Sequence, residues 1–248
     1  MQTTFSIITA TYNSEKTLER TIKSVLNQSY SNFEYIIIDG NSSDKTLYII
    51  KKYEEEFTKK NIVFKYLSEN DKGIYDAWNK GIDLASGEWI SFLGSDDYYL
   101  ENALEIYSNS LQPQYNYIHS KVRLVDENDK HLRILGTPIV KKKFFRYMEI
   151  AHVGSFHHNS LFKNERFSLK YKSASDYFFF LTNFNNINSF YLDQITAVMQ
   201  YGGISTNVNA ALKEALSVKL ETKQRSTLLC YLDFFIAHLK HFVRGCIR

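Results

Sequence analysis

The chain has 248 residues, of which 44% are hydrophobic and 23% are charged. These values are typical of a globular protein, and the length suits one large domain or one domain with an appendage. Ten glycines and two prolines are too few for a disordered or low-complexity chain. Thirty Lys and Arg against 27 Asp and Glu give a net charge of +3, which is too balanced to support nucleic-acid binding through bulk charge.

The cysteines and the apolar segments predict a cytoplasmic protein. Only Cys230 and Cys246 occur, so a disulfide framework is not expected and a reducing compartment fits. The N-terminus enters a strand-like run at residues 5–9 without the basic and long apolar regions of a secretory signal. No window holds the roughly 20 uninterrupted apolar residues that a membrane-spanning helix needs.

Short apolar runs alternate with segments of helical spacing in the first half of the chain, which is typical of a parallel sheet covered by helices. The predicted strands are residues 5–9, 35–38, 62–67 and 89–93, and the predicted helices are residues 17–28, 44–53 and 75–85. Asp44 is the predicted N-cap of the second helix, because its short carboxylate can accept orphan backbone N–H groups.

The second half is less regular. A helix is predicted at residues 100–110, strands at residues 115–119 and 121–125, and a loop-rich stretch at residues 141–175 that contains His152, His157 and His158. From about residue 209 the pattern is helical throughout, which divides the chain into residues 1–205 and an amphipathic helical extension of residues 206–248.

Carboxylates follow three of the predicted strands at the point where each strand ends. They lie in residues 39–44, 68–73 and 94–97. Open α/β sheets bind ligands at this edge, because adjacent loops diverge there. Several carboxylates at one edge repel one another and normally imply a cation, a hydroxyl-rich ligand, or both.

Some of these carboxylates have a second explanation as helix caps. For Asp44 and Asp71, capping explains the residue at least as well as ligand contact. Capping explains the adjacent Asp96 and Asp97 poorly, and such hard oxygen ligands hold Mg²⁺ or Mn²⁺ against a diphosphate. No G-x-G-x-x-G follows the first strand and residues 40–46 lack P-loop spacing, which disfavours dinucleotide oxidoreductases and P-loop NTPases.

Four ordered blocks, at residues 5–13, 35–46, 68–81 and 92–97, resemble the family 2 glycosyltransferases of the GT-A fold. The likeness is closest to bacterial polysaccharide enzymes of the colanic-acid and O-antigen type. It implies an α/β, Rossmann-like GT-A fold with a mostly parallel sheet flanked by helices. It also implies an inverting transfer of a hexose or N-acetylhexosamine from a nucleotide-sugar, commonly UDP-linked, to an acceptor hydroxyl, with Mg²⁺ or Mn²⁺ as cofactor.

The resemblance assigns roles to residues at matching positions. Asp96 and Asp97 match the metal and diphosphate end of the family's aspartate motif, where a cation would act as a Lewis acid on the leaving phosphate. Many members carry an Asp two positions before Asp96, where this chain has Gly94, so a reduced ligand set is expected. The residues expected around the nucleotide-sugar are Thr9, Ala10, Thr11, Tyr12, Asp39, Asp71, Lys72, Gly73, Asp76, Asn79, Ser95 and Asp96.

Two catalytic residues are also expected from the resemblance. An inverting transfer needs a general base, because an alcohol is a poor nucleophile until its proton is removed. Asp176 matches the family's acidic residue at the start of a late helix and is therefore the candidate general base. The alternative is a structural role, in which the backbone N–H groups at the start of the helix satisfy this carboxylate. His158 matches the histidine of a His-Gln block, with a structural role as the alternative. Residues 202–205 match a glycine-bearing loop after the last strand.

The helical tail carries an apolar stripe that includes Leu232, Phe235 and Leu239, with Lys240 and Arg244 near its end. Such a helix binds a membrane interface, the rest of the chain or a second subunit, and the stripe alone does not decide between them. The resemblance favours peripheral contact with the inner face of the cell membrane, because related enzymes extend lipid-linked saccharides there.

Two other functions compete with this expectation. A non-catalytic nucleotide-sugar-binding or scaffold protein of the same fold is conceivable because of Gly94. A sugar nucleotidyltransferase also uses carboxylates and Mg²⁺ on an α/β sheet. It would show a glycine-rich basic loop after the first strand, which residues 10–13 are not.

Overall fold

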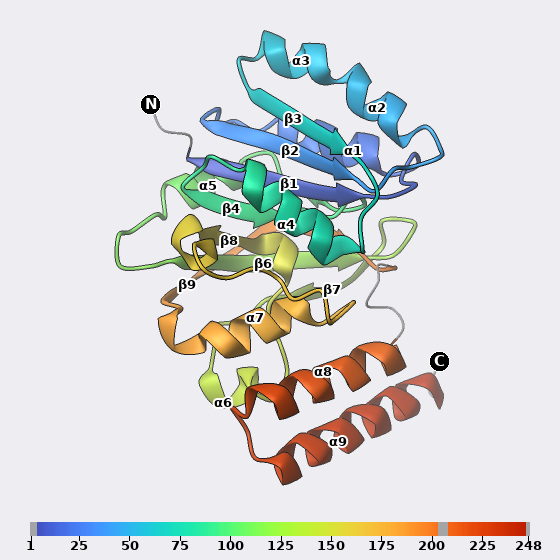
Figure 1. The fold of residues 1–248 in the computed structure, drawn as a ribbon, viewed down its shortest axis with the longest axis vertical. Helices are drawn as coiled ribbons and strands as arrows, with labels where there is room; N and C mark the ends of the chain where they lie inside the picture. Colours follow the sequence, from blue (N-terminus) through green and yellow to red (C-terminus); the bar gives the residue numbers. More distant parts are fainter. Residues whose placement is uncertain (1–3, 203–207, 247–248) are drawn as a thin grey trace.

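Strands and helices alternate in the computed structural model, which describes residues 4–202 and 208–246. The strands are β1 (Phe5–Thr11), β2 (Phe33–Asp39), β3 (Val63–Ser68), β4 (Trp89–Phe92), β5 (Tyr98–Tyr99), β6 (Tyr117–Val125), β7 (His131–Leu135), β8 (Ser155–His158) and β9 (Ser189–Gln200). The helices are α1 (Leu18–Leu26), α2 (Thr46–Lys52), α3 (Glu54–Lys59), α4 (Ile74–Leu84), α5 (Ala103–Ser108), α6 (Lys141–Phe144), α7 (Ser175–Asn183), α8 (Val208–Thr222) and α9 (Thr227–Cys246). In these described ranges nine strands form one sheet in the order β3-β2-β1-β4-β8-β6-β9-β5, with β7 paired to β6 (Figure 1).

The predicted parallel half of the sheet is confirmed. β1 pairs in parallel with β2 and with β4, and β2 pairs in parallel with β3. β2 is buried along its whole length and contains Ile36, Ile37 and Ile38 in succession, as expected of a strand covered on both faces. Because β2 and β4 flank β1 on opposite sides, the ends of β1 and β4 form the switch point at which sheets of this kind bind ligands. We call the ends of β1–β4, with the loops that follow them, the carboxyl edge.

Helices cover both faces of the parallel half. α1 presents Leu18, Ile22 and Val25 to one face, at the three- and four-residue spacing of an amphipathic helix. α4 packs closely on the other face, since a Cβ on Gly81 would lie only 2.4 Å from Cγ2 of Ile8. α4 and α7 cross this same face, and both begin on the side toward which β1–β3 point (Figure 1). The starts of these two helices therefore lie near the carboxyl edge.

The second half of the sheet is mixed. β8 runs antiparallel to β4 and β6, whereas β9 runs parallel to β6. The two strands predicted at residues 115–119 and 121–125 are one strand, β6, whose register with β9 shifts after Ser120. The sequence pattern does not predict β9, because the exposed Asp193 and Gln194 interrupt its apolar run.

The C-terminal segment forms two helices, where the sequence pattern predicts a continuous one. α8 ends at Thr222, and Lys223 in the following turn has a positive φ of 53°. α8 packs against α7 and α9 packs against α8 (Figure 1). No helix in residues 4–202 and 208–246 is long and apolar enough to cross a membrane.

A buried carboxylate attaches α9 to the rest of the chain. Asp233 is almost fully buried and forms ion pairs with Arg225, Arg146 and Lys219, at N–O distances of 2.7, 3.2 and 3.6 Å. A buried charge without such partners would be strongly destabilising. Because Arg146 follows α6 and Lys219 belongs to α8, this cluster fixes the position of α9 against both helices.

Candidate active site

Two adjacent carboxylates converge in the loop after β4. A Cβ placed on Gly94 would lie 2.6 Å from Oδ2 of Asp97 and 3.0 Å from Oδ1 of Asp96, so both oxygens face the same small space. A larger side chain at Gly94 would have to displace these oxygens. The glycine at this position is therefore what allows the two carboxylates to approach each other.

Burial makes this pair of carboxylates electrostatically unfavourable. Asp97 is 8% exposed, and desolvation together with the negative charge of Asp96 raises the pKa of Asp97 to about 8. Desolvation also raises the pKa of Asp96, and the charge of Arg20 partly opposes this effect. Asp97 is therefore expected to hold a proton at neutral pH unless a cation takes the place of that proton.

Contacts from other elements hold the loop in position. The backbone N–H of Gln200, at the end of β9, donates to Oδ1 of Asp97 at 2.8 Å. From α1, the Thr21 hydroxyl donates to the Asp97 carbonyl oxygen at 2.7 Å and the Arg20 guanidinium donates to the Asp96 carbonyl oxygen at 3.1 Å. Helix α1 and strand β9 thus keep the two carboxylates together against their repulsion.

This pair fits a divalent cation that arrives with a diphosphate. No cluster of three or more His, Cys, Asp or Glu side chains that could hold a metal ion occurs in the described part of the chain. Mg²⁺ commonly binds through one or two carboxylates, while substrate phosphates and water supply its other oxygen ligands. Asp96 and Asp97 match that arrangement.

The end of β2 forms the next part of the carboxyl edge. Asp39 is fully buried, and its Oδ2 accepts hydrogen bonds from the Ser68 hydroxyl at 2.6 Å and from the Ser42 backbone N–H at 3.2 Å. Beside it, at the end of β1, the Thr11 hydroxyl is buried and has no hydrogen-bond partner among the described residues. An unsatisfied hydroxyl at a ligand-binding edge is a candidate ligand contact.

Tyr12, Gly40 and Asp71 meet beside Asp39. A Cβ on Gly40 would lie 2.7 Å from Oδ2 of Asp71 and 3.4 Å from Cδ2 of Tyr12. Tyr12 is 64% exposed, so its ring presents a flat apolar surface next to a hydrogen-bond acceptor. This combination suits a nucleobase and its ribose, which need a stacking surface and acceptors for N–H and O–H groups.

The carboxylates of the turn after β3 also support the backbone. Oδ1 of Asp71 accepts a hydrogen bond from the Gly73 N–H at 2.8 Å, and Oδ2 of Asp76 accepts one from the Lys72 N–H at 3.0 Å. Gly73 has a φ of 112°, in the region that favours glycine. The prediction that Asp44 is the N-cap of the second helix is wrong by one residue, because the N-cap of α2 is Lys45; Oδ1 of Asp44 instead accepts a hydrogen bond from the N–H of Thr46, the first residue of α2, at 2.9 Å. Asp44 therefore supports the turn before α2, whereas Asp71 both supports the turn before α4 and faces Tyr12.

Asp176 lies at the start of α7 and contacts the start of α4. Its Oδ1 accepts hydrogen bonds from the Tyr75 hydroxyl at 3.0 Å and from the Tyr177 N–H at 2.8 Å. Tyr75 follows the turn that contains Gly73, so Asp176 is joined through a single side chain to the predicted nucleotide-sugar residues. The Asp176 side chain is 16% exposed. It is therefore fixed in place and mostly buried, with only a small part of its surface exposed to solvent.

Ser95 belongs to the carboxyl edge, whereas Thr9, Ala10 and Asn79 have core partners. The Ser95 hydroxyl lies 2.9 Å from that of Ser14, which links the loops after β1 and β4. Thr9 is fully buried and accepts a hydrogen bond from the Tyr35 hydroxyl, and Ala10 packs against a core cluster. The Asn79 amide donates to the Phe167 carbonyl oxygen at 2.9 Å and accepts from the Phe167 N–H at 3.0 Å. The partners of Thr9 and Asn79 lie away from the carboxyl edge, unlike Ser42 and Ser68, the partners of Asp39, so we leave Thr9 and Asn79 out of the proposed site.

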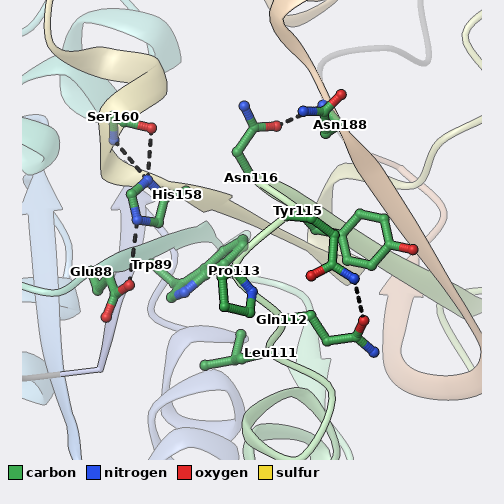
Figure 2. A pocket seen from close by; sticks show the side chains of 11 residues that line it. Glu88, Trp89, Leu111, Gln112, Pro113, Tyr115, Asn116, His158, Ser160 and Asn188 are labelled. Atoms are coloured by element: carbon green, nitrogen blue, oxygen red, sulfur yellow. Dashed lines mark hydrogen bonds and ion pairs between the residues drawn. The ribbon is translucent and has the colours of Figure 1, made fainter.

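His158 lies at the opposite edge of the sheet. It pairs with Trp89 at the start of β4, whereas Asp96 and Asp97 follow the end of that strand. Its Nδ1 lies 2.7 Å from the Ser160 hydroxyl and its Nε2 lies 3.4 Å from Oε1 of Glu88 (Figure 2). The structure does not bring His158 together with the carboxylates, because β8 runs antiparallel to β4 and carries its last residue to the far edge.

A cavity of about 530 Å³ adjoins His158 at this far edge (Figure 2). It is lined by Glu88, Trp89, Leu111, Gln112, Pro113, Gln114, Tyr115, Asn116, His158, Ser160 and Asn188. Of the predicted site residues it contains only His158. We place the site at the carboxyl edge, because converging carboxylates with a perturbed pKa indicate function more specifically than cavity volume does.

His152 is a site residue that the sequence motifs do not assign. It lies in the turn before β8, and its Nδ1 is 3.8 Å from Oδ2 of Asp176. The only sequence signal is its place in the loop-rich stretch of residues 141–175. The predicted glycine-bearing loop at residues 202–205 lies outside the described residues, apart from Gly202.

Comparison with known proteins gives the family. The family model described as "Glycosyl transferase family 2" matches residues 6–179, a span that contains every carboxylate assigned above to the carboxyl edge. The chain belongs to this family, and it is a glycosyltransferase.

Relatives and solved structures agree with this assignment. The PGL/p-HBAD biosynthesis glycosyltransferase of Mycobacterium tuberculosis is 26% identical over 220 residues, which cover 82% of this chain and 80% of the relative. The UDP-Glc:alpha-D-GlcNAc-diphosphoundecaprenol beta-1,3-glucosyltransferase of Escherichia coli is 33% identical over 124 residues, which cover 50% of this chain and 47% of the relative. The crystal structure of S. aureus TarS 1–349 in complex with UDP-GlcNAc has a TM-score of 0.68 at 20% identity and covers 97% of this chain and 73% of TarS. The predicted GT-A fold is confirmed.

Asp97→Asn should stabilise the metal-free protein at alkaline pH. The folded-state pKa of Asp97, about 8, lies above its unfolded value of about 3.9. The stability that its protonated form contributes is thus fully present below about pH 4 and is lost as the pH rises through about 8. Because asparagine does not ionise, the variant should have a higher urea midpoint than the wild type at pH 9 in EDTA, and this difference should shrink at pH 5.

Asp193→Asn is the matched control. Asp193 is exposed, and its hydrogen bond with Lys121 lowers its pKa. This variant should leave the urea midpoint nearly unchanged at both pH values. An Asp97→Asn protein that is no more stable than the wild type at pH 9 would contradict the raised pKa.

Proposed function

We propose that this glycosyltransferase is an inverting enzyme that uses a UDP-linked donor and a lipid-linked saccharide acceptor in cell-surface polysaccharide synthesis. The observation that carries the proposal is the convergence of Asp96 and Asp97, whose charges a cation and a diphosphate would balance. The E. coli relative is named for UDP-Glc and for a diphosphoundecaprenol-linked acceptor, and TarS was crystallised with UDP-GlcNAc. These names support the donor and acceptor classes.

The proposed donor site extends from β2 to the loop after β4. Tyr12, Asp39 and the free hydroxyl of Thr11 take the base and ribose. Asp96 and Asp97 hold Mg²⁺ or Mn²⁺, which when bound stabilises the charge that develops on the leaving diphosphate. Asp71 lies beside Tyr12 on the nucleoside side, and the sugar then lies further along the same turn, toward Lys72 and Gly73, with Asp76 bracing that turn.

Asp176 is the proposed general base. The acceptor oxygen forms a bond to the anomeric carbon while the bond from that carbon to the diphosphate breaks, and the acceptor proton passes to the carboxylate. Attack on the face opposite the leaving group inverts the anomeric centre. The contact of Asp176 with Tyr75 supports this role, because it places the carboxylate next to the turn that would hold the sugar.

Nucleotide binding tests the donor site without the acceptor. We expect UDP with Mn²⁺ to raise the unfolding temperature more than GDP, CMP, dTDP or ADP, since a ligand at 100 times its Kd adds about 2.7 kcal/mol of stability. Asp97→Asn should lose the contribution of Mn²⁺. Asp176→Asn should show the same rise in unfolding temperature with UDP as the wild type. It should release no UDP from UDP-glucose in the presence of diphosphoundecaprenol-linked GlcNAc.

The other outcomes separate the alternatives. A shift with a different nucleotide would overturn the UDP donor. The absence of a shift with every nucleotide would favour a non-catalytic member of the fold. If Asp176→Asn retains wild-type turnover, Asp176 is not the base.

We further propose that residues 1–205 form the catalytic domain and that residues 206–248 hold it at the inner face of the cell membrane. Exposed apolar side chains recur along α9 at steps of three and four; they are Leu228, Leu232, Phe235 and Leu239, with exposures between 50% and 79%. The exposed lysines 141–143 of α6 lie just before Arg146, which pairs with Asp233 of α9. A stripe of exposed apolar side chains binds lipid interfaces, and lysines elsewhere on the same protein add attraction to anionic lipids.

Sedimentation with vesicles tests this attachment. The wild type should pellet with vesicles that contain phosphatidylglycerol, remain in solution with phosphatidylcholine vesicles, and leave the anionic vesicles as salt is raised. The double variant Phe235→Asp and Leu239→Asp should not pellet. Leu132→Asp, a control at an exposed leucine of β7, should pellet like the wild type.

A wild type that stays in solution with anionic vesicles would contradict membrane attachment. If the double variant instead converts a dimer to a monomer in light scattering, α9 packs against a second copy of the chain.

A further inference from the structure

One oxygen of Asp176 already has two hydrogen-bond donors. The Tyr75 hydroxyl and the Tyr177 backbone N–H both donate to Oδ1, at 3.0 and 2.8 Å. An oxygen that accepts two hydrogen bonds is a poor site for a further proton, because its lone pairs are already engaged. A proton taken up by Asp176 is therefore directed to Oδ2.

Oδ2 of Asp176 faces a histidine that has no hydrogen-bond partner in the described part of the chain. Nδ1 of His152 lies 3.8 Å from Oδ2, and within residues 4–202 and 208–246 neither ring nitrogen of His152 makes a hydrogen bond. Burial lowers the pKa of His152, with the charge of Asp176 partly opposing this shift, so the imidazole is neutral at pH 7. A neutral imidazole carries one N–H, which can be directed at Oδ2 without adding a positive charge.

Aromatic contacts fix Tyr75 and His152 relative to each other. The ring of Trp78 stacks on His152 with centroids 4.9 Å apart and an interplanar angle of 14°. The same ring meets Tyr75 edge-on at 5.3 Å and packs against Phe92 of β4 at 4.7 Å. Because Tyr75 and Trp78 are three residues apart on α4, they share one face of the helix. This face of α4 therefore fixes the two side chains that flank the Asp176 carboxylate: it carries Tyr75, and through Trp78 it contacts His152.

We propose that Tyr75 and His152 are positioning residues that orient Asp176 so that Oδ2 takes the proton of the acceptor hydroxyl. This inference rests on the proposed function, in which Asp176 is the general base. The proton moves to Oδ2 as the acceptor oxygen bonds to the anomeric carbon. The bond from that carbon to the diphosphate breaks, UDP keeps the electron pair, and Asp176 later releases the proton to solvent. Tyr75 stays bonded to Oδ1 throughout, and His152 limits rotation of the carboxylate.

The split between kcat and KM in Tyr75→Phe tests this role. The variant keeps the ring and removes one hydrogen bond to a charged group, an interaction worth about 1.5–3 kcal/mol, so kcat at pH 7 should fall about 10- to 100-fold. KM for the UDP-sugar and the unfolding shift with UDP and Mn²⁺ should not change.

Substitutions at His152 test the second contact. His152→Gln retains a neutral donor and should keep more activity than His152→Phe, which retains only a ring. Tyr171→Phe is the matched control, because the Tyr171 hydroxyl donates to the Glu221 carboxylate at 2.6 Å between other elements. This control should have the kcat and KM of the wild type.

Failure of this inference is distinguishable from failure of the proposed function. If Asp176→Asn retains turnover, the general base lies elsewhere and the proposed function fails. If Asp176→Asn is inactive while Tyr75→Phe and His152→Phe keep the kcat of the wild type, the positioning roles are overturned. Equal losses in His152→Gln and His152→Phe would overturn the donor role of His152.

Discussion

Repulsion between Asp96 and Asp97 is the constraint on which the carboxyl edge depends. Both carboxylates face the space beside Gly94, and burial raises the pKa of each. Hydrogen bonds from other elements keep the carboxylates in this position. Thr21 of α1 donates to the Asp97 carbonyl oxygen, and the Gln200 N–H of β9 donates to the Asp97 carboxylate. The fold alone gives no reason for so unfavourable a pair. A ligand that supplies positive charge would explain the pair, and for this reason we place the donor site around these two residues.

Strand direction explains which residues the sheet gathers around this pair. β1, β2, β3 and β4 are parallel, so the loops after them meet at one edge and bring Tyr12, Asp39 and Asp71 together. β8 is antiparallel to β4 and therefore begins at this edge and ends at the other. That single reversal brings His152 to Asp176 and removes His158 from it. Asp176 itself reaches the edge because α4 and α7 begin there together.

Much of this arrangement could be predicted from the sequence, for physical reasons. The run from Ile36 to Ile38 indicates a strand covered on both faces, and the spacing of Leu18, Ile22 and Val25 indicates an amphipathic helix. The position of His152 could not be predicted, because it depends on the direction of β8, a strand of four residues. The core position of Thr9 did have a signal, since Phe5, Ile7 and Thr9 alternate toward one face of β1.

Calorimetric titration of UDP against wild type and Gly94→Ala tests most directly whether Asp96 and Asp97 hold a cation with the nucleotide. Gly94 is outside the left-handed backbone region, so alanine adds only a Cβ, 2.6 Å from Oδ2 of Asp97. We expect Mn²⁺ to lower the Kd of UDP for the wild type. In the variant, the factor by which Mn²⁺ lowers this Kd should be at least about tenfold smaller, which corresponds to about 1.4 kcal/mol of binding free energy. Binding to UDP alone should be the same for both proteins. Equal gains from Mn²⁺ in the two proteins, or no gain in the wild type, would contradict a cation at these carboxylates.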